Sequence, residues 1–251
     1  MRLKDKVAIV TGGVRGIGRA VAEKLMEEGA SVLVTYVEPE EEANPALAEM
    51  KTLADKYDVK IESLYVDISK LPQIKTMFDY CEEHLGQVGI FVGNAASTMP
   101  PKMIVDQTEE DFDYICSVDF KGTYFCVKEC GLRMCDGGKI VLISSSSVTY
   151  PMKGISVYSP AKAAVQMLAR NAALEFGERG INVNCIAPGL TLTQNATDGI
   201  PTEIFEEVKR NTPLNRLGYA PDVAKAVVML CEPNASWISG ETILANGGAR
   251  Y

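Results

Sequence analysis

Residues 6–18, KVAIVTGGVRGIG, decide how the rest of the chain is interpreted. The run 6–11 is short, apolar and rich in valine, which is typical of a strand buried on both faces. Three glycines follow in the spacing G-x-x-x-G-x-G, and they are Gly12, Gly16 and Gly18. They permit a tight turn, close approach of the backbone to a pyrophosphate, and close packing of a helix on the strand. Such a loop is sometimes only structural, but its place in the first strand–helix turn predicts phosphate binding at the helix N-terminus.

Short β-branched runs alternate with longer segments of helical periodicity along the chain. We predict strands at 6–11, 31–36, 60–66, 89–93, 139–144, 182–186 and 242–244. We predict helices at 17–28, 41–56, 71–85, 121–134, 156–176 and 222–230. Apolar strands joined by helical crossovers indicate an α/β fold, a doubly wound parallel sheet of seven strands with helices on both faces. In this Rossmann fold, ligands bind at the carboxyl ends of the strands.

The chain is expected to form a single domain over residues 1–251, because no linker, repeat or low-complexity segment divides it. Residues 188–220 contain no clear element except a short helix near 203–210. Their proline, glycine, threonine and asparagine content suggests a loop. A long irregular segment in a compact domain is typical of a lid, so we predict that it covers the substrate.

Composition excludes several classes of protein. The formal net charge of −8 argues against a nucleic-acid partner, since phosphate binding needs a basic face. No apolar run approaches the roughly 18 residues of a membrane span, and the charged residues 4–6 do not fit a signal peptide. The seven cysteines contain no C-x-x-C pair, and His84 is the one histidine. We therefore expect a cytoplasmic protein without a metal site or a membrane segment.

The choice between NAD and NADP depends on residues near the end of the second predicted strand. Many NAD enzymes of this architecture place a carboxylate there, on the ribose 2′-hydroxyl. This chain has Tyr36 at that position, and Arg15 in the glycine loop is placed to meet a 2′-phosphate. Both features favour NADP(H) slightly over NAD(H). Glu38 and the glutamates at 40–42 would repel a phosphate, although they also suit a solvated helix start.

Asp67 closes the third predicted strand. Its carboxylate is placed either to accept a hydrogen bond from an adenine amino group or to cap the following helix.

A tyrosine and a lysine four residues apart, Tyr158 and Lys162, lie one above the other on a face of the predicted helix 156–176. Hydride transfer to a carbonyl generates an alkoxide that needs a proton. A tyrosine exchanges that proton well near neutral pH only when a nearby cation favours its phenolate. Ser145, at the end of the preceding strand, is placed to hold the substrate oxygen.

The same spacing occurs at Tyr124 and Lys128, because a chain with ten tyrosines produces it by chance. Tyr124 has no partner comparable to Ser145. We interpret Tyr124 as a helix residue packed on the core or at a subunit contact.

These motifs together make the chain resemble the classical short-chain dehydrogenases/reductases along nearly its whole length. The resemblance implies that Ser145 polarises the carbonyl and that Tyr158 is the general acid and base. It implies that Lys162 favours the phenolate of Tyr158 and binds the nicotinamide ribose. The implied activity is NAD(P)(H)-dependent hydride transfer between nicotinamide and a secondary alcohol or ketone.

Two further segments carry the resemblance. Asn94-Ala95-Ala96 resembles the motif that borders the cofactor ribose, and residues 188–193, PGLTLT, resemble the motif that touches the nicotinamide and diphosphate. The resulting cofactor contacts are Gly12, Arg15, Gly16, Ile17, Gly18, Tyr36, Asp67, Ile68, Asn94, Tyr158, Lys162, Pro188, Gly189, Thr191 and Thr193.

One position departs from the family pattern. The asparagine that completes the family's catalytic tetrad falls on Asp119 in this chain. An aspartate can still help to hold a water near Lys162, but it adds negative charge beside the proton relay. The departure affects the expected efficiency and pH dependence rather than the reaction class.

Two other functions stay open. Residues 94–97 and 211–213 resemble stretches of enoyl-acyl-carrier-protein reductases, although Ser145 with Tyr158 suits carbonyl chemistry better. A non-catalytic, cofactor-sensing protein on the same fold is the third reading. Apolar residues near 98–101 and 148–152 favour a bulky apolar substrate such as a hydroxysteroid or a 3-oxoacyl group, although packing of a lid explains them equally.

The resemblance also implies a homotetramer in which helices 121–134 and 156–176 pair with their copies across two-fold axes. Both helices are apolar over more than one core-facing stripe, so they need covering on more than one side. The alternative is that loops of the same subunit cover the extra face. The apolar residues in question are Phe125, Cys126, Val127, Cys130, Met134, Val165, Met167, Leu168, Ala172, Ala173 and Phe176.

Overall fold

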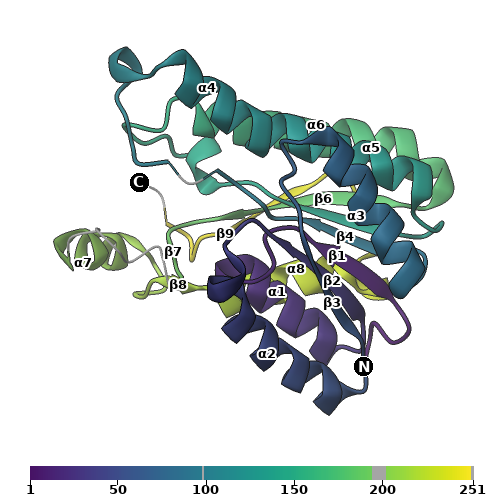
Figure 1. Ribbon diagram of the computed structural model, residues 1–251. Coiled ribbons are helices and arrows are strands. Elements are labelled where there is room, and N and C mark those ends of the chain that lie inside the picture. The colour runs from purple at the N-terminus through teal and green to yellow at the C-terminus, as the bar shows by residue number, and fades with distance from the viewer. Residues whose placement is uncertain (98, 194–201, 250–251) are drawn as a thin grey trace.

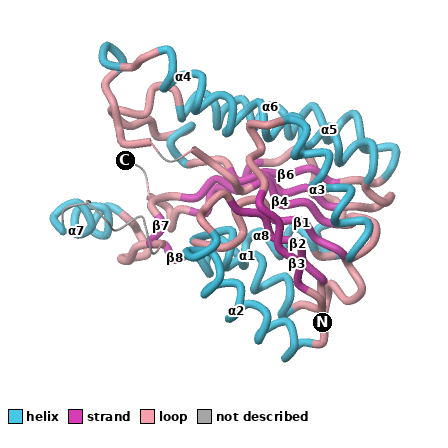
Figure 2. The backbone as a smooth tube through the Cα atoms, viewed as in Figure 1, coloured by secondary structure: helices cyan, strands magenta, loops and turns pink. Residues whose placement is uncertain are grey.

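The computed structural model describes residues 1–97, 99–193 and 202–249, without the side chains of residues 202–205. A seven-stranded parallel sheet in the order β3-β2-β1-β4-β5-β6-β9 forms the middle of three layers, as Figures 1 and 2 show. Its strands are β1 (Val7–Val10), β2 (Ser31–Tyr36), β3 (Ile61–Tyr65), β4 (Ile90–Gly93), β5 (Lys139–Ile143), β6 (Asn182–Pro188) and β9 (Thr242–Ala245). The order reverses between β1 and β4, so the predicted doubly wound fold in a single domain is confirmed.

The helices cover the two faces of the sheet (Figure 1). The helices on one face are α1 (Gly16–Glu27), α2 (Glu40–Tyr57) and α8 (Ala220–Cys231). Those on the other are α3 (Leu71–His84), α5 (Thr123–Arg133) and α6 (Tyr158–Phe176). Successive strand residues serve opposite layers: Ala8 and Val10 pack on the first side, and Ile9 packs on the second.

Sequence periodicity located these strands and helices within a few residues, but it missed three elements. Helix α4 (Glu109–Ile115) begins at Thr108, whose hydroxyl accepts from the Asp111 N–H while the Asp111 carboxylate accepts from the Thr108 N–H. A π-helical segment, Cys116–Gly122, then joins α4 to α5. The third element is a two-stranded sheet of β7 (Thr191–Leu192) and β8 (Gly218–Tyr219).

The predicted lid, 188–220, lies only partly within the described residues. Its short helix is α7 (Thr202–Asn211), which projects from the body of the molecule beside β7 and β8 (Figure 1). Residues 194–201 lie outside the described part of the chain, as do residue 98 and the last two residues.

The apolar residues that suggested a second face on α5 and α6 mostly belong to the core of the same subunit. Most of them are buried in the layer of α3, α5 and α6 or pack against it. Phe176, for example, packs on Gly131, where an added side chain would overlap its ring. Met167 is the exposed member of that set. Leu174, seven residues later on α6, is also exposed. The extra face on these two helices is therefore smaller than the sequence pattern predicts.

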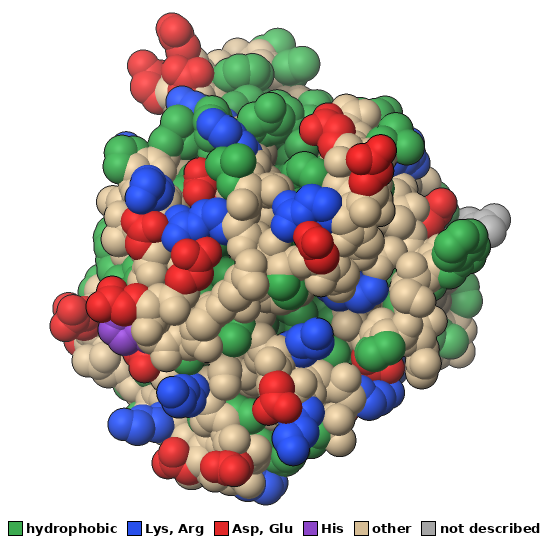
Figure 3. Space-filling view, turned by 90° about the vertical axis from the view of Figure 1, so that its right-hand side faces the viewer, with side chains coloured by type: hydrophobic (Ala, Val, Ile, Leu, Met, Phe, Trp, Pro, Cys, Tyr) green, Lys and Arg blue, Asp and Glu red, His purple; other side chains and the backbone are tan. Residues whose placement is uncertain are grey.

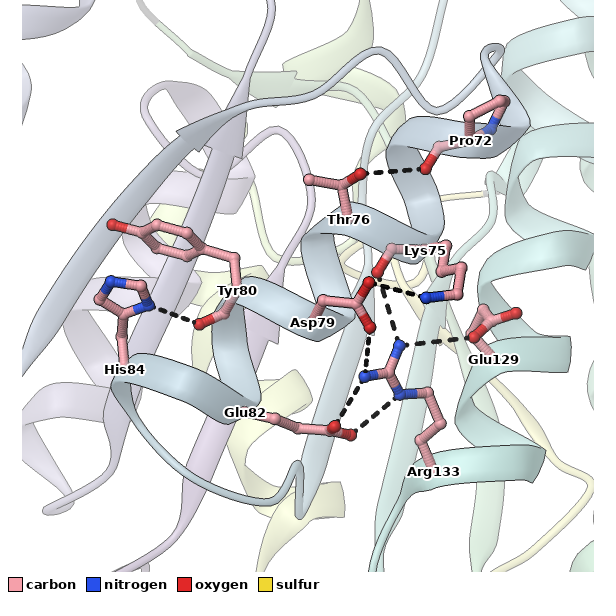
Figure 4. A network of polar contacts seen from close by, with 9 residues as sticks. All are labelled: Pro72, Lys75, Thr76, Asp79, Tyr80, Glu82, His84, Glu129 and Arg133. Atoms are coloured by element: carbon pink, nitrogen blue, oxygen red, sulfur yellow. Dashed lines mark hydrogen bonds and ion pairs between the residues drawn. The ribbon is translucent and has the colours of Figure 1, made fainter.

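Arg133, on α5, joins that helix to α3 (Figure 4). Its guanidinium donates to both carboxylate oxygens of Glu82, at 3.0 and 2.6 Å, and pairs with Asp79 at 2.8 Å. Hydrogen bonds from Lys75 and Arg133 lower the pKa of the Asp79 carboxyl. The network fixes α5 against α3, and α5 continues directly from the π-helical segment that carries Asp119.

Surface charge is mixed on the side away from α7. On the face drawn in Figure 3, acidic and basic side chains are interspersed without a patch of one sign. Within the described ranges, no helix combines the length and apolar character needed to span a bilayer.

Candidate active site

The glycine loop lies at the carboxyl end of β1, at the sheet edge where the strand order reverses. Gly12 and Gly16 have φ of +63° and +54°, a region that residues with side chains rarely adopt. At Gly18 a side chain would overlap the carbonyl oxygen of Gly12, so α1 can approach the loop only because this residue is glycine. The tight turn at Gly12 and the close helix packing at Gly18 are therefore as the spacing predicts, and pyrophosphate binding beside Gly16 stays a prediction.

Asn94, at the end of β4, holds this loop from behind. Its side-chain amide donates to the carbonyl oxygens of Thr11 and Gly12, at 2.9 and 3.0 Å. Its backbone N–H donates to the Thr11 hydroxyl at 3.0 Å. Asn94 therefore positions the glycine loop, a role that the resemblance alone did not identify.

Arg15 leaves the glycine loop toward the end of β2. Its Nε lies 2.7 Å from a carboxylate oxygen of Glu38, so the two residues that argued for opposite cofactors form an ion pair. Arg15 is 42% exposed and Glu38 is 13% exposed, which leaves the guanidinium open to solvent. Tyr36, the last residue of β2 and two residues before Glu38, is buried and packs edge-on against Tyr65.

Asp67 caps the turn before α3, since its carboxylate accepts from the Ser69 N–H at 2.9 Å. The contact lies in the turn and does not cap α3 itself, which begins after Lys70 without a side-chain cap, and adenine binding stays a prediction. Ile68 is buried against the core, and its backbone carbonyl lies so close to Gly122 that a side chain there would overlap it. Ile17, on α1, is partly buried and packs against the core on the opposite face of the sheet.

The segment after β6 returns to the glycine loop. A side chain at Gly16 would lie 3.3 Å from the Thr193 methyl, so the Thr193 side chain lies against the glycine loop. Gly189 donates to the Ala245 carbonyl at 3.1 Å, and the Thr191 hydroxyl donates to the Gly189 carbonyl at 2.9 Å. Pro188 ends β6 in the core of the sheet. These residues form the wall that faces the first turn of α1.

A dinucleotide fits this arrangement. The first N–H groups of α1 face a cradle that glycines keep open at Gly12 and Gly16, with Thr193 as its opposite wall. The N-cap residue of α1, Arg15, makes no side-chain hydrogen bond to the first turn of the helix. The positive end of the helix dipole is therefore available to a phosphate.

Tyr158 is the first residue of α6, and Lys162 follows one turn later. The lysine Nζ lies 5.5 Å from the centre of the tyrosine ring. The Tyr158 side chain is partly exposed, whereas Lys162 is buried. The predicted pair is therefore brought together, with the phenol nearer to solvent and the cation behind it.

Ser145 lies at the end of β5 and is distinguished from its neighbours by exposure. Ser144, Ser146 and Ser147 are buried, and Ser145 alone in this run of four is partly exposed. The Ser144 hydroxyl donates to the Lys162 carbonyl at 3.1 Å, which ties the strand to α6. Ser147 accepts from the Ser159 hydroxyl at 3.0 Å. The neighbouring serines fix the backbone, and the partly exposed Ser145 hydroxyl accepts from the Ser147 N–H at 3.2 Å.

Asp119 is fully buried and lies 2.9 Å from the Lys162 Nζ. The contact is an ion pair whose angle departs from that of a well-formed hydrogen bond. The other carboxylate oxygen accepts hydrogen bonds from the N–H of Ser97, at 3.0 Å, and from its hydroxyl. The lysine also donates to the Ile143 carbonyl at 3.2 Å. Burial, the largest single influence, lowers the pKa of Lys162, but Asp119 together with Tyr158 and Cys185 outweighs it, so the pKa of Lys162 is raised.

Sequence reasoning missed Ser97. Its place directly after Asn94-Ala95-Ala96 was a signal only for an enoyl reductase, and its contact with Asp119 connects residues far apart in the chain.

Tyr124, the chance match, is half exposed and packs edge-on against Phe125. The Lys128 ammonium lies over the Phe125 ring rather than beside Tyr124. The pair lies outside the site.

Known proteins resemble this chain over nearly its whole length. The family described as Enoyl-(Acyl carrier protein) reductase matches residues 12–250. NADPH-dependent aldehyde reductase 2, chloroplastic, of Arabidopsis thaliana is 37% identical over 98% of this chain and 94% of its own length. A hydroxynaphthalene reductase-like protein of Metarhizium brunneum is 32% identical over 98% of this chain and 96% of its own.

A solved structure resembles it as closely. The short chain dehydrogenase from Burkholderia cenocepacia in complex with NADP superposes with a TM-score of 0.90, at 30% identity over 99% of both chains. The chain therefore belongs to the short-chain dehydrogenase/reductase family. It is an oxidoreductase of that family, as its motifs imply.

Proposed function

We propose that the chain is an NADPH-dependent reductase of aldehydes or ketones, with Tyr158 as the proton donor. The observation that carries this proposal is the buried Lys162 ammonium over the Tyr158 ring at the start of α6, which the Ser159–Ser147 hydrogen bond ties to the segment that follows Ser145. Its relatives named as aldehyde and hydroxynaphthalene reductases support the carbonyl class.

The residues divide the chemistry among them. NADPH, when bound along the glycine loop and against residues 188–193, supplies a hydride to the carbonyl carbon. Ser145 donates a hydrogen bond to the carbonyl oxygen and holds it beside Tyr158. The Tyr158 hydroxyl gives its proton to that oxygen as charge develops on it. Lys162 stabilises the phenolate that remains and orients the ribose.

The exposed apolar rim above the site favours a bulky, apolar carbonyl compound. Met99, Met103 and Met152 are 37%, 51% and 64% exposed. The Lys102 N–H donates to the Gly154 carbonyl at 2.8 Å, which holds the loops bearing them side by side. Residues 188–220 are proposed to close over this rim as a lid.

Enoyl-thioester reduction is the second candidate, because the family description names that reaction. The test is NADPH oxidation with a panel of aldehydes, bulky ketones and a 2-enoyl thioester. We expect turnover with the carbonyl compounds. Turnover confined to the enoyl thioester would replace the proposal with the second candidate, and binding of NADPH without any turnover would favour a cofactor sensor.

For the cofactor, we propose that Arg15 contacts the 2′-phosphate of NADP(H). NADP(H) is then expected to bind more tightly than NAD(H), and Arg15→Ala should weaken NADP(H) binding about 10-fold through loss of a charge-assisted hydrogen bond. Glu38→Ala should strengthen NADP(H) binding, because it frees Arg15 and removes a like charge. Calorimetric dissociation constants for both cofactors measure these effects.

Arg19→Ala is the matched control, since this arginine lies on the same helix and pairs with Glu23 and Glu49. It should leave the ratio of the two affinities unchanged. A preference for NAD(H) that disappears in Glu38→Ala would mean that Glu38 binds the ribose 2′-hydroxyl instead.

We propose a homotetramer built on α5 and α6. Tyr124, Leu132, Met167 and Leu174 on these helices are 46%, 67%, 52% and 82% exposed. Light scattering should give four times the chain mass of 27.2 kDa, and Met167→Glu with Leu174→Glu should dissociate the assembly. Val105→Glu, at an exposed apolar residue outside α5 and α6, is the control.

A stable monomer of the parent chain would refute this assembly, and a stable dimer would leave one of the two helix pairings. The cytoplasmic location expected from the sequence stays a prediction, testable by cell fractionation. Two Arabidopsis relatives are named chloroplastic.

A further inference from the structure

The buried pair of Asp119 and Lys162 places a full negative charge where the resemblance predicts a neutral asparagine. Asp119 is 0% exposed and Lys162 is 3% exposed, so water screens neither charge. Ser97 holds the second carboxylate oxygen through its N–H and its hydroxyl. Ser97 therefore holds the Asp119 carboxylate in place beside Lys162.

The titratable groups that face Lys162 come from three elements. Asp119 faces it from the π-helical segment, Cys185 from β6, and Tyr158 from its own helix. Cys116 faces Asp119 from the same segment, and burial raises the pKa of the Cys185 thiol to about 12. Both thiols are therefore neutral at physiological pH, and Asp119 is the charged group that acts on Lys162.

A lone buried ammonium 5.5 Å from a phenol ring strongly favours the phenolate. An ammonium and a carboxylate 2.9 Å apart form a pair with no net charge, and the field of this pair at the phenol is that of a dipole. The phenol beside such a pair holds its proton to higher pH than the phenol beside a lone cation.

We propose that Asp119 is a positioning residue that keeps Tyr158 protonated by pairing with Lys162, and so favours reduction over oxidation at neutral pH. The inference rests on the proposed function, in which Tyr158 donates the proton. Reduction needs the phenol: its O–H bond breaks, and the proton passes to the carbonyl oxygen as the carbonyl carbon gains the hydride. Oxidation of the alcohol needs the phenolate instead, because the alcohol proton must pass to the tyrosine oxygen.

The test compares Asp119→Asn with the parent chain by ultraviolet titration of tyrosinate. Tyr158→Phe is prepared in both backgrounds, and its titration is subtracted to isolate the signal of Tyr158. We expect this signal to appear at a pH about one unit lower in Asp119→Asn, the usual scale for one nearby charge. The titration needs neither cofactor nor substrate.

Enzyme kinetics supply the second readout. The rate of reduction should fall at high pH, and the rate of oxidation should rise with pH. In Asp119→Asn the midpoint pH of both changes should be lower by the shift seen in the titration. Oxidation at neutral pH should rise about 10-fold, the equivalent of one pH unit.

Two controls separate charge from loosened packing. Asp136→Asn removes an equal charge from an exposed carboxylate and should shift nothing. Ser97→Ala weakens the fixation of Asp119 but keeps the ion pair, so it should lower thermal stability without moving the titration. If Asp119→Asn does not fold, Asp119→Ser provides a second neutral side chain.

The proposal is overturned if the Tyr158 titration of Asp119→Asn superposes on that of the parent, or if Ser97→Ala shifts it equally. Failure of the proposed function has a different signature, because full carbonyl reduction by Tyr158→Phe would show that Tyr158 is not the proton donor.

Discussion

Tyr158→Phe is expected to lower the rate of carbonyl reduction by about 10²-fold or more, the usual contribution of a general acid. The substitution removes one oxygen from a partly exposed ring and leaves the glycine loop untouched. NADPH affinity should therefore stay close to that of the parent. Steady-state kinetics with the best carbonyl substrate and calorimetry with NADPH give the two values.

Tyr124→Phe is the matched control, because it removes the same oxygen from the other tyrosine that has a lysine four residues later. Its ring packs on Phe125, away from the site, and we expect parent-like kinetics. Parent-like turnover by Tyr158→Phe would contradict the mechanism.

Lys162→Met is expected to lower the free energy of unfolding by about 3–5 kcal/mol and to abolish most activity. The substitution leaves the carboxylate of Asp119 buried without its counter-ion, and breaking a buried pair on one side is strongly destabilising. The Ile143 carbonyl also loses a donor. Urea denaturation measures the stability, and NADPH oxidation measures the activity.

The double variant Lys162→Met with Asp119→Asn separates these two effects. Removing both charges should restore most of the stability, since the uncompensated carboxylate is gone. Activity should stay low, because no cation remains beside Tyr158. A double variant as unstable as Lys162→Met alone would show that packing around the lysine stem, rather than the ion pair, accounts for the loss.

Local sequence patterns predicted most of the fold. Buried parallel strands are short apolar runs, and the glycine spacing around residues 12–18 has few structural solutions, so β1 and α1 were recognisable within a residue or two. Helix α4 was not predicted, because its seven residues are largely acidic and exposed. The sheet of β7 and β8 pairs two-residue segments, which leave almost no periodic signal.

The site was less predictable where it depends on contacts between distant segments. The Tyr158–Lys162 pair lies on one helix, so its spacing was sufficient. Arg15 and Glu38 were judged separately as cofactor determinants, although they bind each other. The contact of Asp119 with Ser97 depends on how the π-helical segment packs against the end of β4, and a single sequence does not encode that distance in any local pattern.

The most direct test of the central claim is the fate of deuterium carried at both positions of C4 of NADPH, so that either hydride transferred is labelled. The chain is incubated with the labelled cofactor and the ketone that gives the highest turnover in the panel, and the product is analysed by mass spectrometry and NMR. We predict one deuterium on the carbinol carbon of the alcohol, at about 10²-fold lower rate in Tyr158→Phe. An alcohol without deuterium would contradict the account. So would an incubation with an enone that yields a saturated ketone with the label on its β-carbon and the carbonyl intact.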